Sequence, residues 1–438
     1  MKECRKEFLS MVRFIKDIVT NKELSKKILY DILIVVVFLL GSSIPIYGID
    51  REYLQEWLGT VYKNGINIFS LLSGNSFTSM SIFALGVAPY ISASIIVQLL
   101  TIIVPKLEDL RKQSQDKIEV YTYILSAILA VIQSFGAALY FYNAGLLQEK
   151  NYAYFLLVAA ILTFGSVLII SFAKSIDDHG IGKGVSIIML ANILSQLPSS
   201  VFYLFLGTVK SLNQLPIFVL CLFGAVSLVL IGIIYLQNAE KRIHIQHAGQ
   251  TRTMHKMNSV NYIPIKLNLG NVMPVIFTSS LFQMFLIIAN YVKNDTLSEI
   301  AKYVNMNYWF NVSQPIYNLG IIPYTILIIL FSYFYTAFSF DAEEVANNLK
   351  KQNIVIVNVR PGELSVNYLK SQLKYLVLIG AVLLTLIVLI PTAVIGFLKV
   401  SNFALAGTSL LIINSVIIDL YKDIETEVIT KREVDFFE

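Results

Sequence analysis

The sequence predicts an all-α membrane protein with ten transmembrane helices, and three observations support this prediction. Of the 438 residues, 56% are hydrophobic and 14% are charged, whereas soluble domains carry about 25% charged residues. The apolar residues gather in ten runs, each close to the roughly 20 residues that cross a bilayer core. The basic residues gather in alternate connections between these runs. This composition argues against a water-soluble enzyme and excludes a disordered chain.

The ten predicted spans are dominated by Leu, Ile, Val and Phe. They cover residues 28–47, 79–104, 119–143, 152–173, 185–205, 214–238, 271–292, 319–340, 373–397 and 403–421. An even number of spans places both chain termini on the same side of the membrane. Of the 34 Lys and Arg residues, 27 fall in segments on that side. Because cytosolic loops carry an excess of basic residues, we expect both termini in the cytosol.

Three connections are unusually long. Residues 239–270 and 340–372 are predicted cytosolic loops, and polar loops of this length are commonly functional or disordered. On the opposite side, residues 48–78 include a short apolar stretch at 66–72 that cannot span a bilayer. Such a segment is tolerated at membrane depth only where it is buried in protein or lines a cavity. We therefore expect a re-entrant or plugging element at about residues 65–77.

Residues that would carry reaction chemistry are not evident. The four histidines, among them His244, His247 and His255, fall in predicted cytosolic loops, where we expect solvated side chains rather than a metal site. The stretch Gly180–Gly184 lacks the spacing and the Ser/Thr of a phosphate-binding loop, so we interpret it as a glycine-rich turn entering a span. We interpret Asp177 and Asp178 as two solvated residues of a turn. We expect no catalytic residue, no metal and no cofactor.

The predicted spans carry ionisable residues only near their ends. Ion-coupled transporters usually keep a carboxylate or a lysine in mid-span, so a secondary transporter is disfavoured and an apolar path is favoured. Pro89 and Pro274 lie in spans 2 and 7, five spans apart. This fits either an inverted repeat of five plus five helices or the general tolerance of proline in membrane helices. Small polar side chains in the spans fit either ordinary helix packing or a seam that opens; they are Ser92, Ser94, Gln133, Ser134, Thr278, Ser279 and Ser280.

Four ordered stretches resemble the SecY family of protein-conducting channel subunits. Met80–Leu100 resembles its second span, and this match is highly specific. Gly180–Ser186 is similar to the entry of its fifth span. Tyr335–Ala337 with Ala346–Lys351 and Val359–Gly362 resembles the eighth span and the loop after it, and Gly407–Ile412 resembles the tenth. The resemblance extends from about residue 65 to 420.

The resemblance implies ten helices in two pseudo-symmetric five-helix halves around a central hourglass pore. The expected regions are a cytosolic segment at 1–27, an N-terminal half at 28–208, a C-terminal half at 209–422 and a cytosolic tail at 423–438. The halves hold spans 1–5 and spans 6–10, and the C-terminal half includes both long docking loops. An apolar ring would close the pore, because aliphatic side chains offer ions no replacement for water; its members are Val87, Ile91, Val185, Met189, Ile276 and Ile412.

Further roles follow from the same resemblance. A lateral gate between spans 2–3 and 7–8 would include Ser92, Ser94, Gln133, Thr278 and Ser279. Docking of the SecA motor or the ribosome would use Lys241, Arg242 and Arg360. The plug would contain Ile66, Ile68, Phe69, Leu71 and Leu72.

The implied function is passage of unfolded secretory chains across a bacterial plasma membrane, with lateral release of apolar segments into lipid. The chain would not be an enzyme and would not itself bind nucleic acid. Its implied partners are SecE, SecG, SecA or the ribosome, signal peptides, preproteins and lipids. Gly249 and Gln250 stand where the family has a basic pair, so an accessory channel for a narrow substrate set stays an alternative. A secondary transporter with inverted repeats and a scaffold without a pore also stay open.

Overall fold

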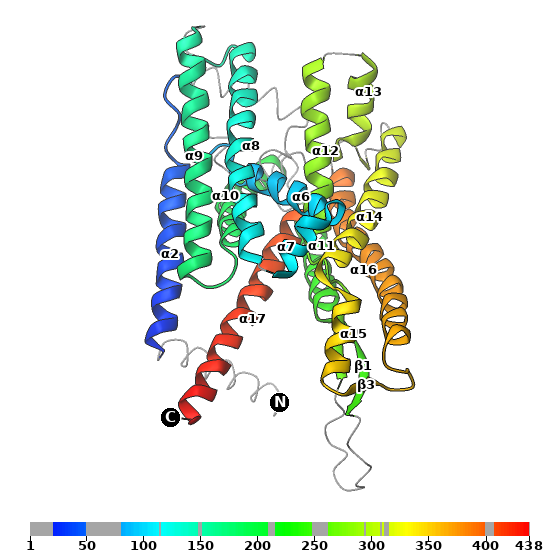
Figure 1. Cartoon of the computed structure of the whole chain (residues 1–438). Coiled ribbons are helices and arrows are strands. Elements are labelled where there is room, and N and C mark those ends of the chain that lie inside the picture. The colour runs from blue at the N-terminus through cyan, green and yellow to red at the C-terminus, as the bar shows by residue number, and fades with distance from the viewer. Residues whose placement is uncertain are drawn as a thin grey trace. The chain divides into compact units, whose positions relative to one another are not determined.

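A computed structural model describes most of the chain, and Figure 1 shows its elements. The described residues are 21–49, 80–113, 115–147, 151–208, 215–247, 262–292, 295–306, 309–310, 315–398 and 407–437. The predicted plug at 65–77, with its residues Ile66, Ile68, Phe69, Leu71 and Leu72, lies outside the described residues, as does His255.

A helix overlaps each of the ten predicted spans. These helices are α2 (Lys22–Ser42), α6 (Ala88–Ile103), α8 (Gln115–Ala144), α9 (Tyr152–His179), α10 (Gly184–Thr208), α11 (Leu215–Asn238), α12 (Met273–Val292), α14 (Ile321–Ser339), α16 (Glu363–Leu398) and α17 (Gly407–Phe437). Within the described part of the chain, four helical segments are long and apolar enough to cross a membrane, or five if the bent pair α6 and α7 (Pro105–Gln113) counts as one. The number of ten spans and the central pore stay predictions.

The chain divides into two compact units. Unit 1 comprises Met1–Tyr203 and Val416–Glu438, and unit 2 comprises Leu204–Ser415. In unit 1, α8 packs against both α6 and α9, α9 also packs against α2, and α7 contacts α6 and α8. The last helix, α17, contributes its first residues to unit 2 and the rest to unit 1. It runs without interruption to Phe437, past the predicted end of the tenth span at 421, so the predicted tail continues the same helix.

The second predicted span, 79–104, is helical only from Ala88. Residues 80–87 instead form turns that lie along the end of α2: the Ile46 amide donates to the Met80 carbonyl (2.8 Å), and the Ile82 amide donates to the Ile44 carbonyl (3.1 Å). The hydrophobic run could not show this, because a buried turn and a helix can be equally apolar. The chain that follows α2 holds this segment from one side, and α9 packs closely against it at Gly165.

The described chain is mostly helical, as the predicted all-α fold requires, and unit 2 adds a small sheet that the prediction did not include. In the membrane part, α14 packs against α12 and α16, and α16 also packs against α11. α13 (Asp295–Val304) and the 3-10 helix η2 (Pro315–Gly320) connect α12 to α14 and contact each other. The sheet has the order β2-β1-β3, with all pairs antiparallel. Its strands are β1 (Glu240–His247), β2 (Tyr262–Lys266) and β3 (Ile354–Ile356).

The sheet joins the two predicted cytosolic loops into one folded piece, which we call the cytosolic module after the predicted side of these loops. It consists of β1–β3, α15 (Ala342–Lys351) and the first turns of α16. Its core includes Ile243, Ile265, Ile356 and the fully buried Leu369. Asp341 caps the N-terminus of α15, and its carboxylate accepts the Glu343 and Glu344 amides. The region 340–372 is therefore ordered and mostly helical rather than a long loop.

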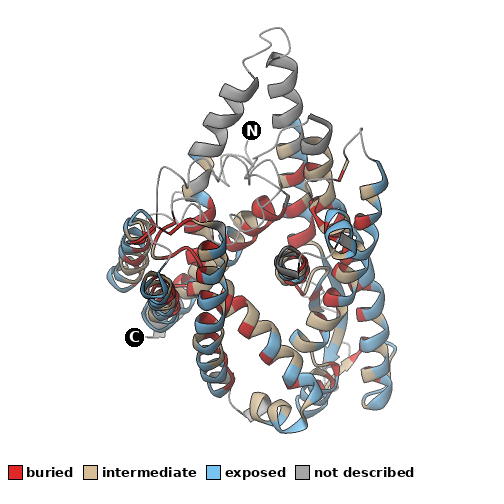
Figure 2. Ribbon diagram, turned by 90° about the horizontal axis from the view of Figure 1, so that it is seen from above, coloured by how far each residue is buried: buried red, intermediate tan, exposed pale blue. Residues whose placement is uncertain are grey.

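The helices bury one side and expose another that is largely apolar. Figure 2 shows buried and exposed positions along the same helices. On α2, the exposed set includes Leu29, Ile32, Leu33, Val36 and Leu40, and α8 exposes a similar set from Val120 to Leu139. Exposed apolar surfaces of this extent are unusual in soluble monomers and are what lipid-facing helices require.

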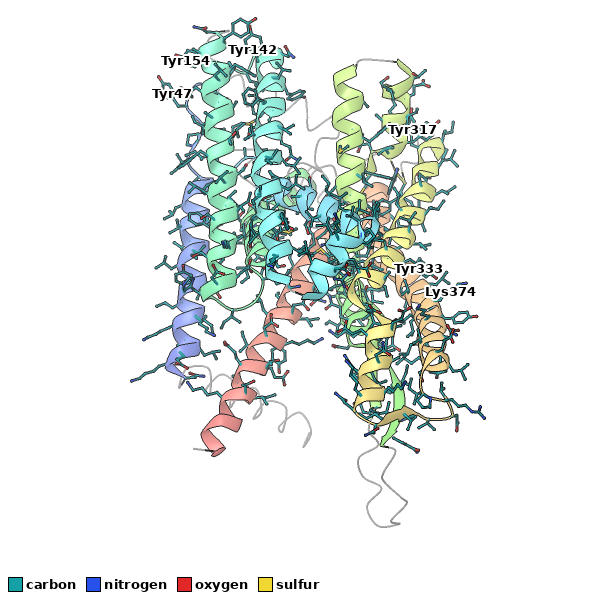
Figure 3. The ribbon with its side chains drawn as sticks, viewed as in Figure 1. Tyr47, Tyr142, Tyr154, Tyr317, Tyr333 and Lys374 are labelled. Atoms are coloured by element: carbon teal, nitrogen blue, oxygen red, sulfur yellow. The ribbon has the colours of Figure 1, made fainter. Side chains whose placement is uncertain are left out.

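Tyrosines mark one end of the helices of unit 1. Tyr47, Tyr142 and Tyr154 gather at the end of α8 and α9 that is remote from Gly180 (Figure 3). The ring of Tyr142 stacks on that of Tyr152 at 6.1 Å. Tyrosine is enriched where membrane helices meet water, so this end is well suited to the membrane interface. In unit 2, the Tyr333 hydroxyl, also shown in Figure 3, donates to the Lys374 carbonyl (2.8 Å).

Candidate functional site

The first two residues of the predicted pore ring lie at the start of α6. Val87 is the residue before the helix, and Pro89 occupies its first turn, where proline needs no amide partner. Val87 is 1% exposed and Ile91 is 6% exposed. The turn segment before Val87 is held against α9 by Gly165: a Cβ at this position would lie 2.0 Å from the Ile82 carbonyl oxygen. Close packing of backbone on backbone therefore sets where α6 begins.

The next two ring residues lie in the first turns of α10. Met189 is buried, and Val185 is partly exposed. α10 begins at Gly184, whose amide donates to Asp177 Oδ1 at 2.7 Å. The other carboxylate oxygen, Oδ2, accepts the Tyr123 hydroxyl of α8 at 3.0 Å. Asp177 is exposed, yet it is not merely a solvated turn residue, because it ties the N-terminus of α10 to α8.

The glycine-rich turn between α9 and α10 packs against two other helices of unit 1, α2 and α17, and against α9 itself. Asp31 of α2 accepts the Ile181 amide at 2.9 Å. Gly182 has a φ of +82°, and a Cβ there would lie 2.6 Å from Leu420 of α17. A Cβ at Gly184 would lie 2.0 Å from the Ala173 carbonyl oxygen. Each glycine thus permits an approach that a side chain would block, which explains the spacing without any phosphate-binding role.

The C-terminal half of α17 is bound to the start of α2. Leu24 and Val428 pack with Ile181 in one apolar cluster. Around this cluster, Lys27 pairs with Glu427, and Lys431 pairs with Glu23 at 3.0 Å. The Lys431 ammonium, through its hydrogen bond and its charge, holds the pKa of Glu23 below its usual value. The partners in this contact lie some 400 residues apart, so no local pattern in the sequence indicates it.

The remaining two ring residues lie in unit 2. Ile276 is in the first turns of α12, and Ile412 is in the first turns of α17; each is 7% exposed. Five of the six predicted ring residues are therefore buried. Their assignment to one ring joins the two units and stays a prediction.

The predicted gate residues make hydrogen bonds within their own units. In unit 1, Gln133 Nε2 of α8 donates to Ser92 Oγ of α6 at 3.4 Å, and Gln98 Nε2 donates to Ser94 Oγ at 3.0 Å. In unit 2, the buried Thr278 hydroxyl donates to the Pro274 carbonyl of the same helix at 2.8 Å. Ser279 lies in the next position and is partly exposed.

The three predicted docking residues belong to the cytosolic module and are exposed. Lys241 donates a hydrogen bond to Gln372 of α16. Arg242 pairs with Glu240 (2.9 Å) and lies over the Tyr262 ring at 4.8 Å. The Glu240 carboxylate raises the pKa of Arg242 above its already high usual value. Arg360 follows β3, which pairs with β1.

These docking residues belong to two loops that are far apart in the sequence, whereas the sheet places them on one folded piece. Alternating apolar residues were the signal for its strands, at Ile243 and Ile245, at Ile263 and Ile265, and at Ile354 and Ile356. Among the described residues, no group of three or more metal-ligating side chains is placed to hold a metal ion.

The SecY family model matches residues 81–421. The chain belongs to the SecY family. Curated proteins named "Protein translocase subunit SecY" include those of Aquifex aeolicus (34% identical over 435 residues, 96% of this chain and 98% of the relative) and Escherichia coli K12 (34% over 420 residues, 92% and 91%). The SecY of Staphylococcus epidermidis is 34% identical over 443 residues, covering 98% of this chain and 99% of the relative.

Solved structures agree on the fold of this SecY family member. The structure described as a protein conducting channel matches with a TM-score of 0.69 at 20% identity, covering 92% of each chain. Sec61 in the canine ribosome-channel complex matches with a TM-score of 0.63 at 19% identity and the same coverage. The family and the exposed apolar helices together make the chain a multi-pass membrane protein.

Proposed function

We propose that this chain is the channel subunit of a protein translocase, which conducts unfolded secretory polypeptides across a membrane and releases apolar segments laterally into lipid. The observation that carries the proposal is its 34% identity, along almost its full length, to proteins named protein translocase subunit SecY. The described helices support it, since their buried interiors offer apolar side chains rather than a mid-span charge.

The proposed pore closes through the ring of Val87, Ile91, Val185, Met189, Ile276 and Ile412. An aliphatic ring excludes ions because it cannot replace their hydration, and the unbranched Met189 side chain adapts to a moving polypeptide. The gate residues Ser92, Ser94, Gln133, Thr278 and Ser279 would form a seam held by weak hydrogen bonds. Residues 65–77 would plug the resting pore.

Partners and location complete the proposal. SecE and SecG would assemble with the chain in a bacterial plasma membrane, with both termini in the cytosol. The driving energy would come from SecA or the ribosome, so the chain itself would not be an enzyme. The cytosolic module supports a docking role, because Lys241, Arg242 and Arg360 are exposed on one folded piece.

The ring is tested by comparing glycine substitutions on two faces of the same helices. Ile91→Gly and Ile276→Gly remove proposed ring side chains, whereas Ile96→Gly on α6 and Leu281→Gly on α12 remove exposed ones. All four carry a similar loss of helix propensity, about 1 kcal/mol. We expect potassium leak from reconstituted translocon vesicles, or export of preproteins with defective signals, only for the first pair. Unchanged leak and export in that pair would refute the pore.

Docking is tested by Arg360→Glu. We expect this change to abolish SecA-driven export while the chain still assembles with its partners, because the side chain is exposed and reversing its charge leaves the module core intact. Normal export by Arg360→Glu would refute the docking assignment.

A further inference from the structure

Three polar side chains meet inside unit 2, at the turn that precedes α12. The Asn271 carboxamide oxygen accepts hydrogen bonds from Gln237 Nε2 at the end of α11 (3.2 Å) and from the Ser415 hydroxyl of α17. We call Gln237, Asn271 and Ser415 the polar node. Gln237 is 9% exposed and Ser415 is 1% exposed. The node therefore joins α11, α17 and the start of α12 where little water can compete for the hydrogen bonds.

The backbone at Asn271 is suited to an asparagine. Its φ is +50°, in the left-handed region, which asparagine tolerates better than most residues other than glycine. The turn is closed by the Met273 amide, which donates to the Gly270 carbonyl (3.1 Å), and by Asn268 Nδ2, which donates to the Asn271 carbonyl (2.9 Å). Asn271 thus meets two requirements at once: a left-handed backbone and an oxygen acceptor.

Both proposed ring residues of unit 2 lie within about one and a half helical turns of a residue of this node. The Val272 carbonyl, next to Asn271, accepts the amides of Val275 (3.0 Å) and Ile276 (3.2 Å). On α17, Ser415 follows Ile412 by three residues, which is about one helical turn. A hydrogen bond between Asn271 and Ser415 therefore fixes the axial position of α12 relative to α17. It thereby sets the relative heights of Ile276 and Ile412.

We propose that Asn271 is a positioning residue of the channel: its carboxamide, held by Gln237 and Ser415, sets the register of the two ring side chains of unit 2 and so keeps the resting pore sealed. This inference rests on the proposed channel function. Losing the acceptor leaves two buried donors unsatisfied, which costs more than the net gain of a single hydrogen bond. α17 then shifts relative to α12, and the ring admits ions.

The experiment measures potassium efflux from vesicles that hold the chain assembled with its translocon partners. Asn271→Gly keeps the left-handed backbone but removes the acceptor, whereas Asn271→Asp keeps both. Ser415→Ala removes one donor, and Ser415→Thr keeps it. We expect Asn271→Gly and Ser415→Ala each to raise the leak about three- to fivefold, the factor typical of one membrane hydrogen bond. Asn271→Asp and Ser415→Thr should stay within about twofold of the parent, given the retained bond.

The combined variant separates positioning from a general loss of stability. If the two side chains act through one bond, Asn271→Gly with Ser415→Ala leaks no more than Asn271→Gly alone. The inference would be overturned if the two substitutions multiplied each other's effect on the leak, or if Asn271→Gly leaked no more than the parent. If Asn271→Gly fails to assemble, the comparison of leak between Ser415→Ala and Ser415→Thr tests the inference, because neither variant changes the turn at Asn271. Ile276→Gly serves as the reference: if it too fails to leak, the channel proposal itself has failed.

Discussion

Gly165 lies inside α9, where its missing side chain lets the helix touch the backbone of Ile82. A Cβ at this position would lie 2.0 Å from the Ile82 carbonyl oxygen and 2.8 Å from its carbon. An ordinary Cβ contact needs at least 3.4 Å, so Gly165→Ala forces the two backbones apart by about 1.4 Å. The obstacle is backbone rather than the end of a flexible side chain, so it cannot be relieved by a rotamer change.

The expected magnitude follows from two opposing terms. Alanine gains about 1 kcal/mol over glycine in a helix, and overpacking costs up to about 3 kcal/mol, so Gly165→Ala should destabilise unit 1 by about 2 kcal/mol. Gly136 of α8 is the matched control, because a Cβ there meets nothing within 4 Å. Gly136→Ala should therefore stabilise by up to about 1 kcal/mol. The propensity gain cancels in the comparison, and the difference between the variants, about 3 kcal/mol, measures the clash.

Thermal unfolding of both variants in detergent tests this expectation. A unit of this size shifts by about 2–4 °C per kcal/mol, so the midpoint should fall by about 4 °C or more for Gly165→Ala and rise slightly for Gly136→Ala. Shifts of equal size and sign would refute the argument that α9 and the Ile82 backbone are in direct contact.

The cytosolic module, the α10 anchor and the α17 contact give three further predictions. Leu369→Ala empties a fully buried site, should cost about 2–5 kcal/mol and should speed proteolysis of the module; an unchanged cleavage rate would contradict its core position. Asp177→Ala removes two hydrogen bonds and Tyr123→Phe removes one, so the first should lower the unfolding midpoint more, and equal effects would argue against a shared carboxylate. Lys431 lowers the pKa of Glu23 from its usual 4.5. The ion pair therefore stabilises the contact between α2 and α17 fully above pH 4.5, and this stabilisation is lost as the pH falls through the lowered pKa. As the pH falls below 4.5, amide hydrogen exchange in α17 should rise in the parent but not in Glu23→Gln. Identical pH dependence in the two proteins would show that the Lys431–Glu23 pair does not stabilise α17.

The positions of the membrane helices could be predicted because a bilayer core requires long apolar runs. Each run is visible without knowing its neighbours, and every predicted span overlaps a helix. The ends of these helices were less predictable. α6 begins at Ala88 rather than near 79 because Gly165 admits the backbone of the preceding turn. The strands of the cytosolic module escaped prediction because each is short and pairs with a partner from a distant loop.

The sequence by itself determined the class of protein, its family and the residue types at the proposed ring, since these depend on local composition and on ordered motifs. The tertiary structure alone decided which polar side chains act together. Asp177 reaches Tyr123 across 54 residues, and Ser415 reaches Asn271 across 144. A hydrogen bond depends on the distance between two atoms in the fold, and that distance is set by helix packing, on which the spacing of residues along the chain carries no information.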